Sequence, residues 1–131
     1  MIRSKFVRKV WTVALCVGGA VAYAGPSALL PIKAGTYVLS SYKPCAEAPL
    51  AGVVEFDGKA IFGPHESHCT ASVLARHGRT YEVSTECRAH GDGTPETPST
   101  GVRTVRVESS SRLALIEQGK PVEYELCPSF H

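Results

Sequence analysis

Apolar and polar residues alternate with a period of two along much of the chain, a pattern typical of half-buried antiparallel strands. The clearest example flanks Gly78, where folding the chain back places Cys69 opposite Cys87 in a predicted hairpin over residues 69–88. The other residues of that face are Ala71, Val73, Ala75, Tyr81, Val83 and Thr85. The opposite face is polar apart from Leu74, so we expect one side of the hairpin to be buried.

Further short strands are predicted on both sides of this hairpin. Asp57 and Gly58 lie between two β-prone runs and indicate a turn, because glycine accepts a positive φ without penalty. The other predicted strands cover residues 35–41, 102–108, 112–117 and 122–127. After residue 24 no window keeps a helical period over three turns. The sequence therefore predicts an all-β fold: a single small antiparallel meander of about eight strands, closed as a barrel or packed as a sandwich.

The longest break in the strand pattern covers residues 89–101, which contain three glycines and two prolines. This composition predicts a long, mobile surface loop. Long loops on rigid β scaffolds often carry binding residues. We therefore take His90, Asp92 and Glu96 as candidate partner-binding residues.

Residues 1–24 have the pattern of a cleavable export signal. Four basic residues precede an apolar run over 12–22, and Ala22-Tyr23-Ala24 is a small-x-small cleavage pattern. The apolar run is too short to cross a hydrocarbon core of about 30 Å, which disfavours an uncleaved anchor. Leu15 before Cys16 disfavours a lipoprotein signal. We expect cleavage after Ala24 and a location in the bacterial periplasm or outside the cell.

Removing this segment changes the composition. Residues 25–131 form one domain of 107 residues with ten basic and twelve acidic side chains, a formal charge of −2 rather than the +2 of the whole chain. The basic character therefore belongs to the signal, and neither nucleic acid nor an anionic membrane is an expected partner. No later segment is apolar enough to span a bilayer, so we expect no integral membrane segment after cleavage.

Four cysteines remain: Cys45, Cys69, Cys87 and Cys127. An even number in a small exported chain predicts two disulfides, and the absence of any C-x-x-C pair disfavours a zinc site. We favour Cys45–Cys69 with Cys87–Cys127, because each bridge would tie a loop or chain end to the central hairpin. The competing set is Cys69–Cys87 with Cys45–Cys127, since the hairpin places the first two opposite each other.

The densest group of metal-binding residue types is His65, Glu66 and His68, beside Cys69. Its spacing does not match the helical H-E-x-x-H motif, and a loop fixes ligand geometry poorly. The chain also lacks a G-x-S-x-G nucleophile motif, and oxidised cysteines cannot act as thiols. We therefore predict no catalytic, cofactor-binding or metal-binding residue, and a protein that is not an enzyme.

Three short motifs carry a resemblance: residues 30–37 followed by Cys45, residues 81–83 leading to Cys87, and Glu123-Tyr124 leading to Cys127. They resemble a largely uncharacterised group of small exported proteobacterial β proteins, whose overall plan is similar to that of periplasmic lysozyme inhibitors. The resemblance implies a disulfide-bonded β-barrel after a signal peptide. It also implies a lytic enzyme such as lysozyme, or a secreted toxin, as the class of partner.

We therefore expect an exported, non-enzymatic binding or inhibitor module of the cell envelope. One alternative is a carrier whose barrel interior holds a small apolar ligand, lined by Tyr37, Phe56, Phe62, Tyr81 and Tyr124. Another is a structural envelope protein without a ligand. Arg103, Arg106 and Arg112 form a possible positive stripe, but interleaved Glu108 and Glu117 favour a neutral surface network.

Overall fold

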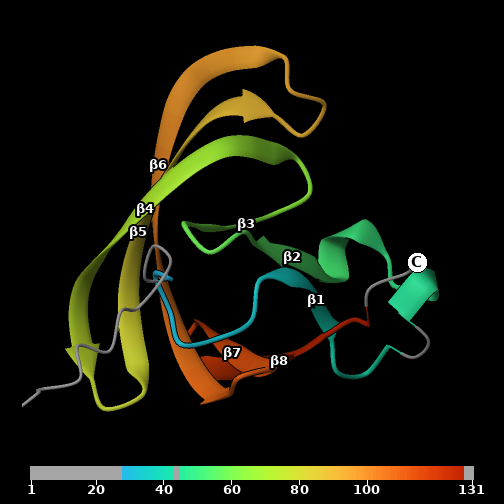
Figure 1. Ribbon diagram of the computed structural model, residues 1–131, viewed down its shortest axis with the longest axis vertical. Helices are drawn as coiled ribbons and strands as arrows, with labels where there is room; N and C mark the ends of the chain where they lie inside the picture. Colours follow the sequence, from blue (N-terminus) through green and yellow to red (C-terminus); the bar gives the residue numbers. More distant parts are fainter. Residues whose placement is uncertain (1–27, 43–44, 129–131) are drawn as a thin grey trace, which may run out of the picture.

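The computed structural model describes residues 28–42 and 45–128, which form an all-β barrel without an α-helix (Figure 1). Its eight strands are β1 (Gly35–Leu39), β2 (Val53–Phe56), β3 (Ile61–Phe62), β4 (Glu66–His77), β5 (Thr80–His90), β6 (Pro95–Ser109), β7 (Arg112–Glu117) and β8 (Lys120–Leu126). Two short 3-10 turns, η1 (Cys45–Glu47) and η2 (Leu50–Gly52), lie between β1 and β2. The predicted signal segment, 1–24, lies outside the described residues.

The strands follow the order β3-β2-β1-β8-β7-β6-β5-β4, and every pair is antiparallel. β1 pairs with β8, with Tyr37 opposite Leu126, so the first and last strands join the two ends of the meander. β3 and β4 are the two sheet edges, and side chains rather than a backbone ladder fill the seam between them: Ala60 packs against Cys69 and Cys87. The predicted all-β meander with two disulfides is confirmed, as a nearly closed barrel.

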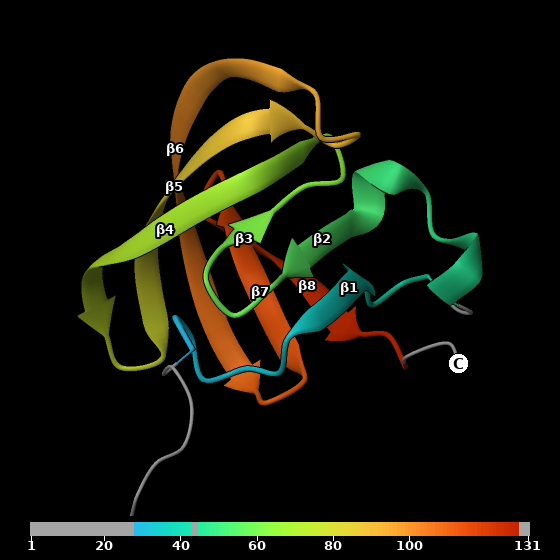
Figure 2. The ribbon, with the colours of Figure 1, turned by 45° about the horizontal axis from the view of Figure 1, so that its top comes forward.

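One end of the barrel is covered by the segment that precedes β1. Leu30 and Ile32 are buried in the main core, and the backbone N–H groups of Leu29 and Lys33 donate to the carbonyls of Gly58 and Ser110, each at 2.8 Å. The same segment crosses the ends of the strands in Figure 2. This segment therefore belongs to the folded core.

Two tight turns follow from their local sequence. Gly58 has a φ of +90°, and the Asp57 carboxylate accepts hydrogen bonds from the N–H groups of Lys59 and Ala60, both at 2.8 Å. Gln118 and Gly119, with φ values of +51° and +75°, form the two-residue turn between β7 and β8. Positive φ at both central residues gives a turn whose twist matches that of the flanking strands. The turn predicted at Asp57 and Gly58 is confirmed.

The central hairpin departs from strict alternation at one point. Cys69 lies opposite Cys87 and Val73 opposite Val83, as predicted, but the register shifts between Val73 and Ala75. Ala75 therefore faces Glu82 instead of Tyr81, and the intervening Leu74 is exposed. A β-bulge adds one residue to one strand, which explains why Leu74 interrupts the polar face.

The prediction of a long mobile loop over residues 89–101 is wrong. β5 continues to His90 and β6 begins at Pro95, which leaves only residues 91–94 as a turn. Ala89 lies opposite Pro95 and Cys87 opposite Ser99, so pairing with β5 orders a segment whose composition resembles a loop. Proline is compatible with the start of a strand or with a bulged, unpaired position, and the β5–β6 register shifts just here.

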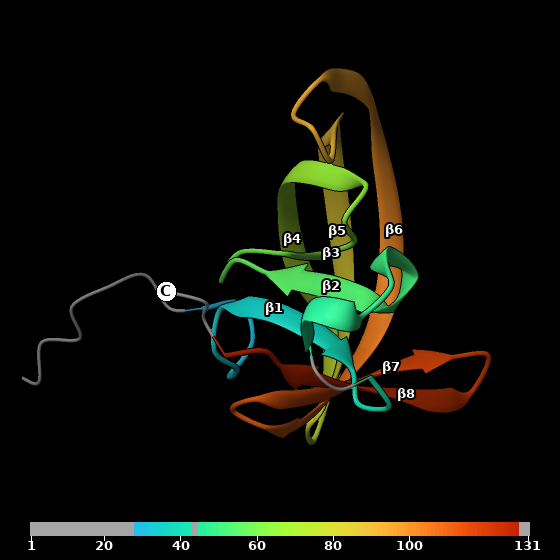
Figure 3. The same ribbon diagram turned by 90° about the vertical axis from the view of Figure 1, so that its right-hand side faces the viewer.

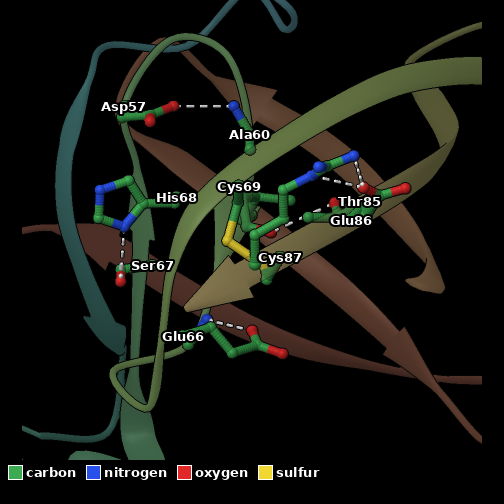
Figure 4. The surroundings of a disulfide bond; sticks show 12 residues. Asp57, Ala60, Glu66, Ser67, His68, Cys69, Thr85, Glu86 and Cys87 are labelled. Atoms are coloured by element: carbon green, nitrogen blue, oxygen red, sulfur yellow. Dashed lines mark hydrogen bonds and ion pairs between the residues drawn. A yellow bond between two sulfur atoms is a disulfide. The ribbon is translucent and has the colours of Figure 1, made fainter. Parts of the chain in front are cut away.

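The favoured disulfide pairing, Cys45–Cys69 with Cys87–Cys127, is also wrong. The bridges are Cys69–Cys87 and Cys45–Cys127, with Cα–Cα distances of 4.1 and 6.0 Å. The first joins directly opposed residues of β4 and β5 and is buried at the seam of the barrel (Figure 4). The second ties η1 to the end of β8, where the Cys127 N–H donates to the Thr36 carbonyl. The register of the hairpin therefore decides the pairing.

Alkaline pH is expected to destabilise the barrel. Burial raises the pKa of Tyr37 and of Tyr124 above the ordinary value, so both are expected to bind their protons more tightly in the folded state. The resulting stabilisation is present below a pH of about 10 and is lost as the pH rises through the raised values. Absorbance at 295 nm should show two late-ionising tyrosines, with unfolding by circular dichroism over the same pH range. If all tyrosines ionised together without any loss of structure, burial of these two phenols would be contradicted.

Candidate functional site

The three candidate binding residues lie together in the hairpin end of β5 and β6, residues 90–96, which we call the tip. The Asp92 carboxylate accepts hydrogen bonds from the N–H and the hydroxyl of Thr94, at 3.0 and 2.7 Å. These bonds hold the pKa of Asp92 below its ordinary value. His90 Nδ1 lies 3.0 Å from Glu96 Oε2. The candidate residues are therefore brought together, but each also shapes the tip itself.

A second segment, residues 63–67, holds the tip in place. The Gly91 N–H donates to the His65 carbonyl at 2.9 Å, and the Ser67 hydroxyl donates to the His90 carbonyl at 2.5 Å. A Cβ atom on Gly91 would lie 2.1 Å from the Pro64 carbonyl oxygen, so only glycine fits this approach. Sequence reasoning missed this contact, because the two segments are distant in the chain.

Gly91→Ala is expected to lower the free energy of unfolding by about 1–3 kcal/mol, because the added methyl group must displace the Pro64 backbone. The matched control is Gly101→Ala on β6, where a Cβ would meet no atom within 4 Å. Urea unfolding followed by circular dichroism compares the two variants. Equal stability of both would show that the tip does not pack on residues 63–67.

The segment before β1 that contains Leu30, residues 28–34, covers one end of the barrel and is called the Leu30 cover. A cleft of about 560 Å³ opens at the opposite end. It is bounded by the beginning of β2, the 63–65 connection, residues 102–104 of β6 and the end of β7. Its apolar walls include Leu50 and Val102, which are 61% and 59% exposed. The volume of the cleft is within the usual range of pockets that bind small molecules.

Polar groups surround the inner part of this cleft. Tyr124 lines it, and the pKa of its phenol is raised first by burial and then by the Glu117 charge, against the opposing charge of Arg103. Arg103 lies 3.6 Å from Glu66, whose carboxylate also accepts a 3.1 Å hydrogen bond from the Gly63 N–H. Glu66 thereby links the 63–66 turn to the guanidinium group at the cleft.

The five aromatic residues expected around an interior ligand are distributed differently. Tyr37, Phe56, Tyr81 and Tyr124 pack in the main core, and Phe62 is half-buried beside the Cys69–Cys87 bridge. Of the five, Tyr124 lines the cleft. These side chains fill the interior of the barrel and leave the cleft at its end.

The arginine stripe is largely neutralised. Arg106 pairs with Glu108 at 2.7 Å, and Arg112 pairs with Glu123 at 3.1 Å. Arg103 lies apart from these two and pairs with Glu66 instead. The predicted surface network is confirmed for Arg106 and Arg112, with Glu123 rather than Glu117 as the second carboxylate.

His65 and His68 do not converge on one point. His65 contributes its carbonyl to the tip, while His68 adopts a φ of +51° and its Nδ1 lies 3.2 Å from the Ser67 hydroxyl (Figure 4). Within residues 28–42 and 45–128, no three His, Cys, Asp or Glu side chains form a group that could hold a metal ion. In the same part of the chain, no helix is long and apolar enough to cross a membrane.

Comparison with known proteins adds no relative: no family model, no curated protein and no solved structure matches the chain.

Proposed function

We propose that the protein is an exported, non-enzymatic binding protein of the cell envelope, and that its tip engages and inhibits a lytic enzyme or toxin. The observation that carries the proposal is the fixed conformation of the tip. Hydrogen bonds of Gly91 and of the His90 carbonyl hold it against residues 63–67, and Thr94 braces it from within. A segment ordered before association loses less conformational entropy on binding.

The charge of the tip favours a basic partner. Asp92 is exposed, Glu96 lies beside His90, and residues 25–131 carry a formal charge of −2. Opposite charges on two binding surfaces raise the association rate and disfavour wrong partners. Basic lytic enzymes such as lysozymes are therefore the partners we propose to test first.

Export is supported by the pattern of residues 1–24 and by the two disulfides, which persist in oxidising compartments. The intact mass of the protein from the periplasm or medium is expected to correspond to residues 25–131. Tryptophan fluorescence should then be absent, because the single tryptophan is Trp11. A retained N-terminus would indicate an anchored protein and overturn this part of the proposal.

The tip is tested with the double variant Asp92→Asn/Glu96→Gln, which removes two charges and preserves the side-chain shapes. Immobilised protein is exposed to a panel of purified lysozymes, and both binding and residual lytic activity are measured. We expect binding and inhibition to fall at least tenfold in the variant. The matched control, Glu47→Gln/Glu82→Gln, removes two exposed charges elsewhere and should leave both unchanged.

Two outcomes contradict the proposal. Lysozyme binding that survives the tip variant but is lost in the control variant would move the site away from the tip. Absence of binding to every lysozyme, together with a small molecule or lipid that copurifies, would favour a carrier.

A further inference from the structure

The upper half of β6 has a strand neighbour on one side only. β6 pairs with β5 from Ser99 to Arg106 in an unbroken register, whereas β7 pairs with β6 from Val105 onward. Figure 3 shows β6 continuing well past the β7–β8 hairpin. Within the described residues, no turn or loop hydrogen bond involves the backbone of residues 99–104. The edge of β6 facing away from β5 is therefore open over these residues.

The register identifies the backbone groups at this edge. The Val107 N–H donates to the carbonyl of Arg79, which directly precedes β5, so Val107 directs its N–H toward the β5 side. Backbone groups alternate between the two sides of a strand. Counting back from Val107, the odd-numbered residues from 99 to 105 direct their backbone N–H and C=O groups toward β5. Thr100, Val102 and Thr104 direct their N–H and C=O groups toward the open edge.

The cleft runs along this edge. Val102, Arg103 and Thr104 line it as three consecutive residues, and the end of β7 contributes three more, Leu115, Ile116 and Glu117. Consecutive side chains of a strand point to opposite faces, so a cleft that touches three in a row lies beside the strand and not over one face. Unpaired backbone groups and an apolar recess therefore occupy the same place.

We propose that the open edge of β6 at residues 100–104 accepts an extended peptide segment of a partner protein, which adds a strand and places an apolar side chain in the cleft. Donors and acceptors repeating every second residue match a peptide backbone and not a compact ligand. The cleft beside this edge, lined by η2 and by the end of β7, offers a recess for one side chain of the peptide. Pro98, two residues before Thr100, has no N–H, so the row of backbone donors does not continue on the N-terminal side. This site is separate from the tip.

The probe is an acetylated and amidated heptapeptide of alternating threonine and valine with terminal lysines, added to the ¹⁵N-labelled, disulfide-bonded protein. Without the peptide, the amides of Thr100, Val102 and Thr104 should exchange rapidly with solvent, while those of Gly101 and Arg103, which face β5, are protected. At saturation we expect exchange at the three edge amides to slow at least tenfold. An analogue with N-methylated valines, which cannot donate, should bind at least tenfold more weakly.

A pair of variants distinguishes binding at this site from non-specific binding to exposed apolar side chains. Val102→Lys places a charge at the rim of the cleft and should weaken peptide binding at least tenfold, whereas Leu74→Lys should not, although Leu74 is exposed to the same extent, 58% against 59%. The tip variant Asp92→Asn/Glu96→Gln should also bind the peptide normally, so that failure of one site is distinguishable from failure of the other.

Three results would overturn the inference. Equal binding of the N-methylated peptide would show that the cleft takes an apolar side chain without strand pairing. Protection of the edge amides that rises with protein concentration alone would show a second copy of the chain at this edge. No slowing of exchange at millimolar peptide would show that the edge accepts no strand.

Discussion

Replacing Cys45 and Cys127 together by alanine is expected to lower the free energy of unfolding by about 4 kcal/mol. The two residues are 82 positions apart, so their bridge restricts most of the unfolded chain and removes more of its conformational entropy than a short loop would. In the folded state the bridge holds η1 and the end of β8 together. Urea unfolding of the refolded variant, compared with the parent protein under oxidising conditions, measures the difference.

The control is the variant Cys69→Ala/Cys87→Ala, which keeps the long-range bridge. Its 18-residue separation corresponds to about 3 kcal/mol of chain entropy, and loss of two buried sulfur atoms beside Ala60 adds a packing defect. Peptide mapping of both variants checks that the remaining cysteines keep their native pairing. A loss below about 1 kcal/mol in the Cys45/Cys127 variant would contradict a stabilising role for that bridge.

The strands themselves could be predicted because alternation reports directly on burial. On β5, the residues expected on the buried face of the hairpin are all buried: Tyr81, Val83, Thr85 and Cys87. The errors arose where strand pairing overrides local composition. Pro95 and Pro98 indicate a loop locally, yet β5 supplies a partner strand for this segment. The disulfide error has the same origin, since bridge geometry depends on register and not on chain ends.

The candidate site was predictable only in part. Asp92 and Glu96 were selected because they lie among glycines and prolines, and they do lie at the tip. The contacts that fix the tip and the cleft join residues far apart in the chain: Gly91 with His65, and Arg103 with Glu66. A periodic pattern carries no information about such contacts. The glycine at position 91 is the single local sign of the close approach.

The role of the Leu30 cover in the core was not predicted, for a related reason. Truncation of Leu30 is the second change expected to have a large effect on stability. Leu30 is 1% exposed and lies in the main core, although its neighbours show no strand pattern. Leu30→Ala is expected to lower the free energy of unfolding by about 2–5 kcal/mol, because truncation leaves a cavity at the end of the barrel. Urea unfolding measures the loss, and faster hydrogen exchange at Leu29 and Lys33 should accompany it, since their N–H groups hold the segment in place.

Leu50→Ala is the matched control, since it removes the same atoms from a side chain that is 61% exposed. Its effect on stability should stay within about 0.5 kcal/mol. If Leu30→Ala were equally mild, the segment before β1 would be an appendage and not part of the core, and the barrel would have to be stable with that end open. Tyr37 distinguishes the two cases independently, because its hydroxyl donates to the Lys33 carbonyl at 2.6 Å. Detachment of the segment would break this hydrogen bond and expose the Tyr37 phenol. The pKa of Tyr37 would then fall toward its ordinary value.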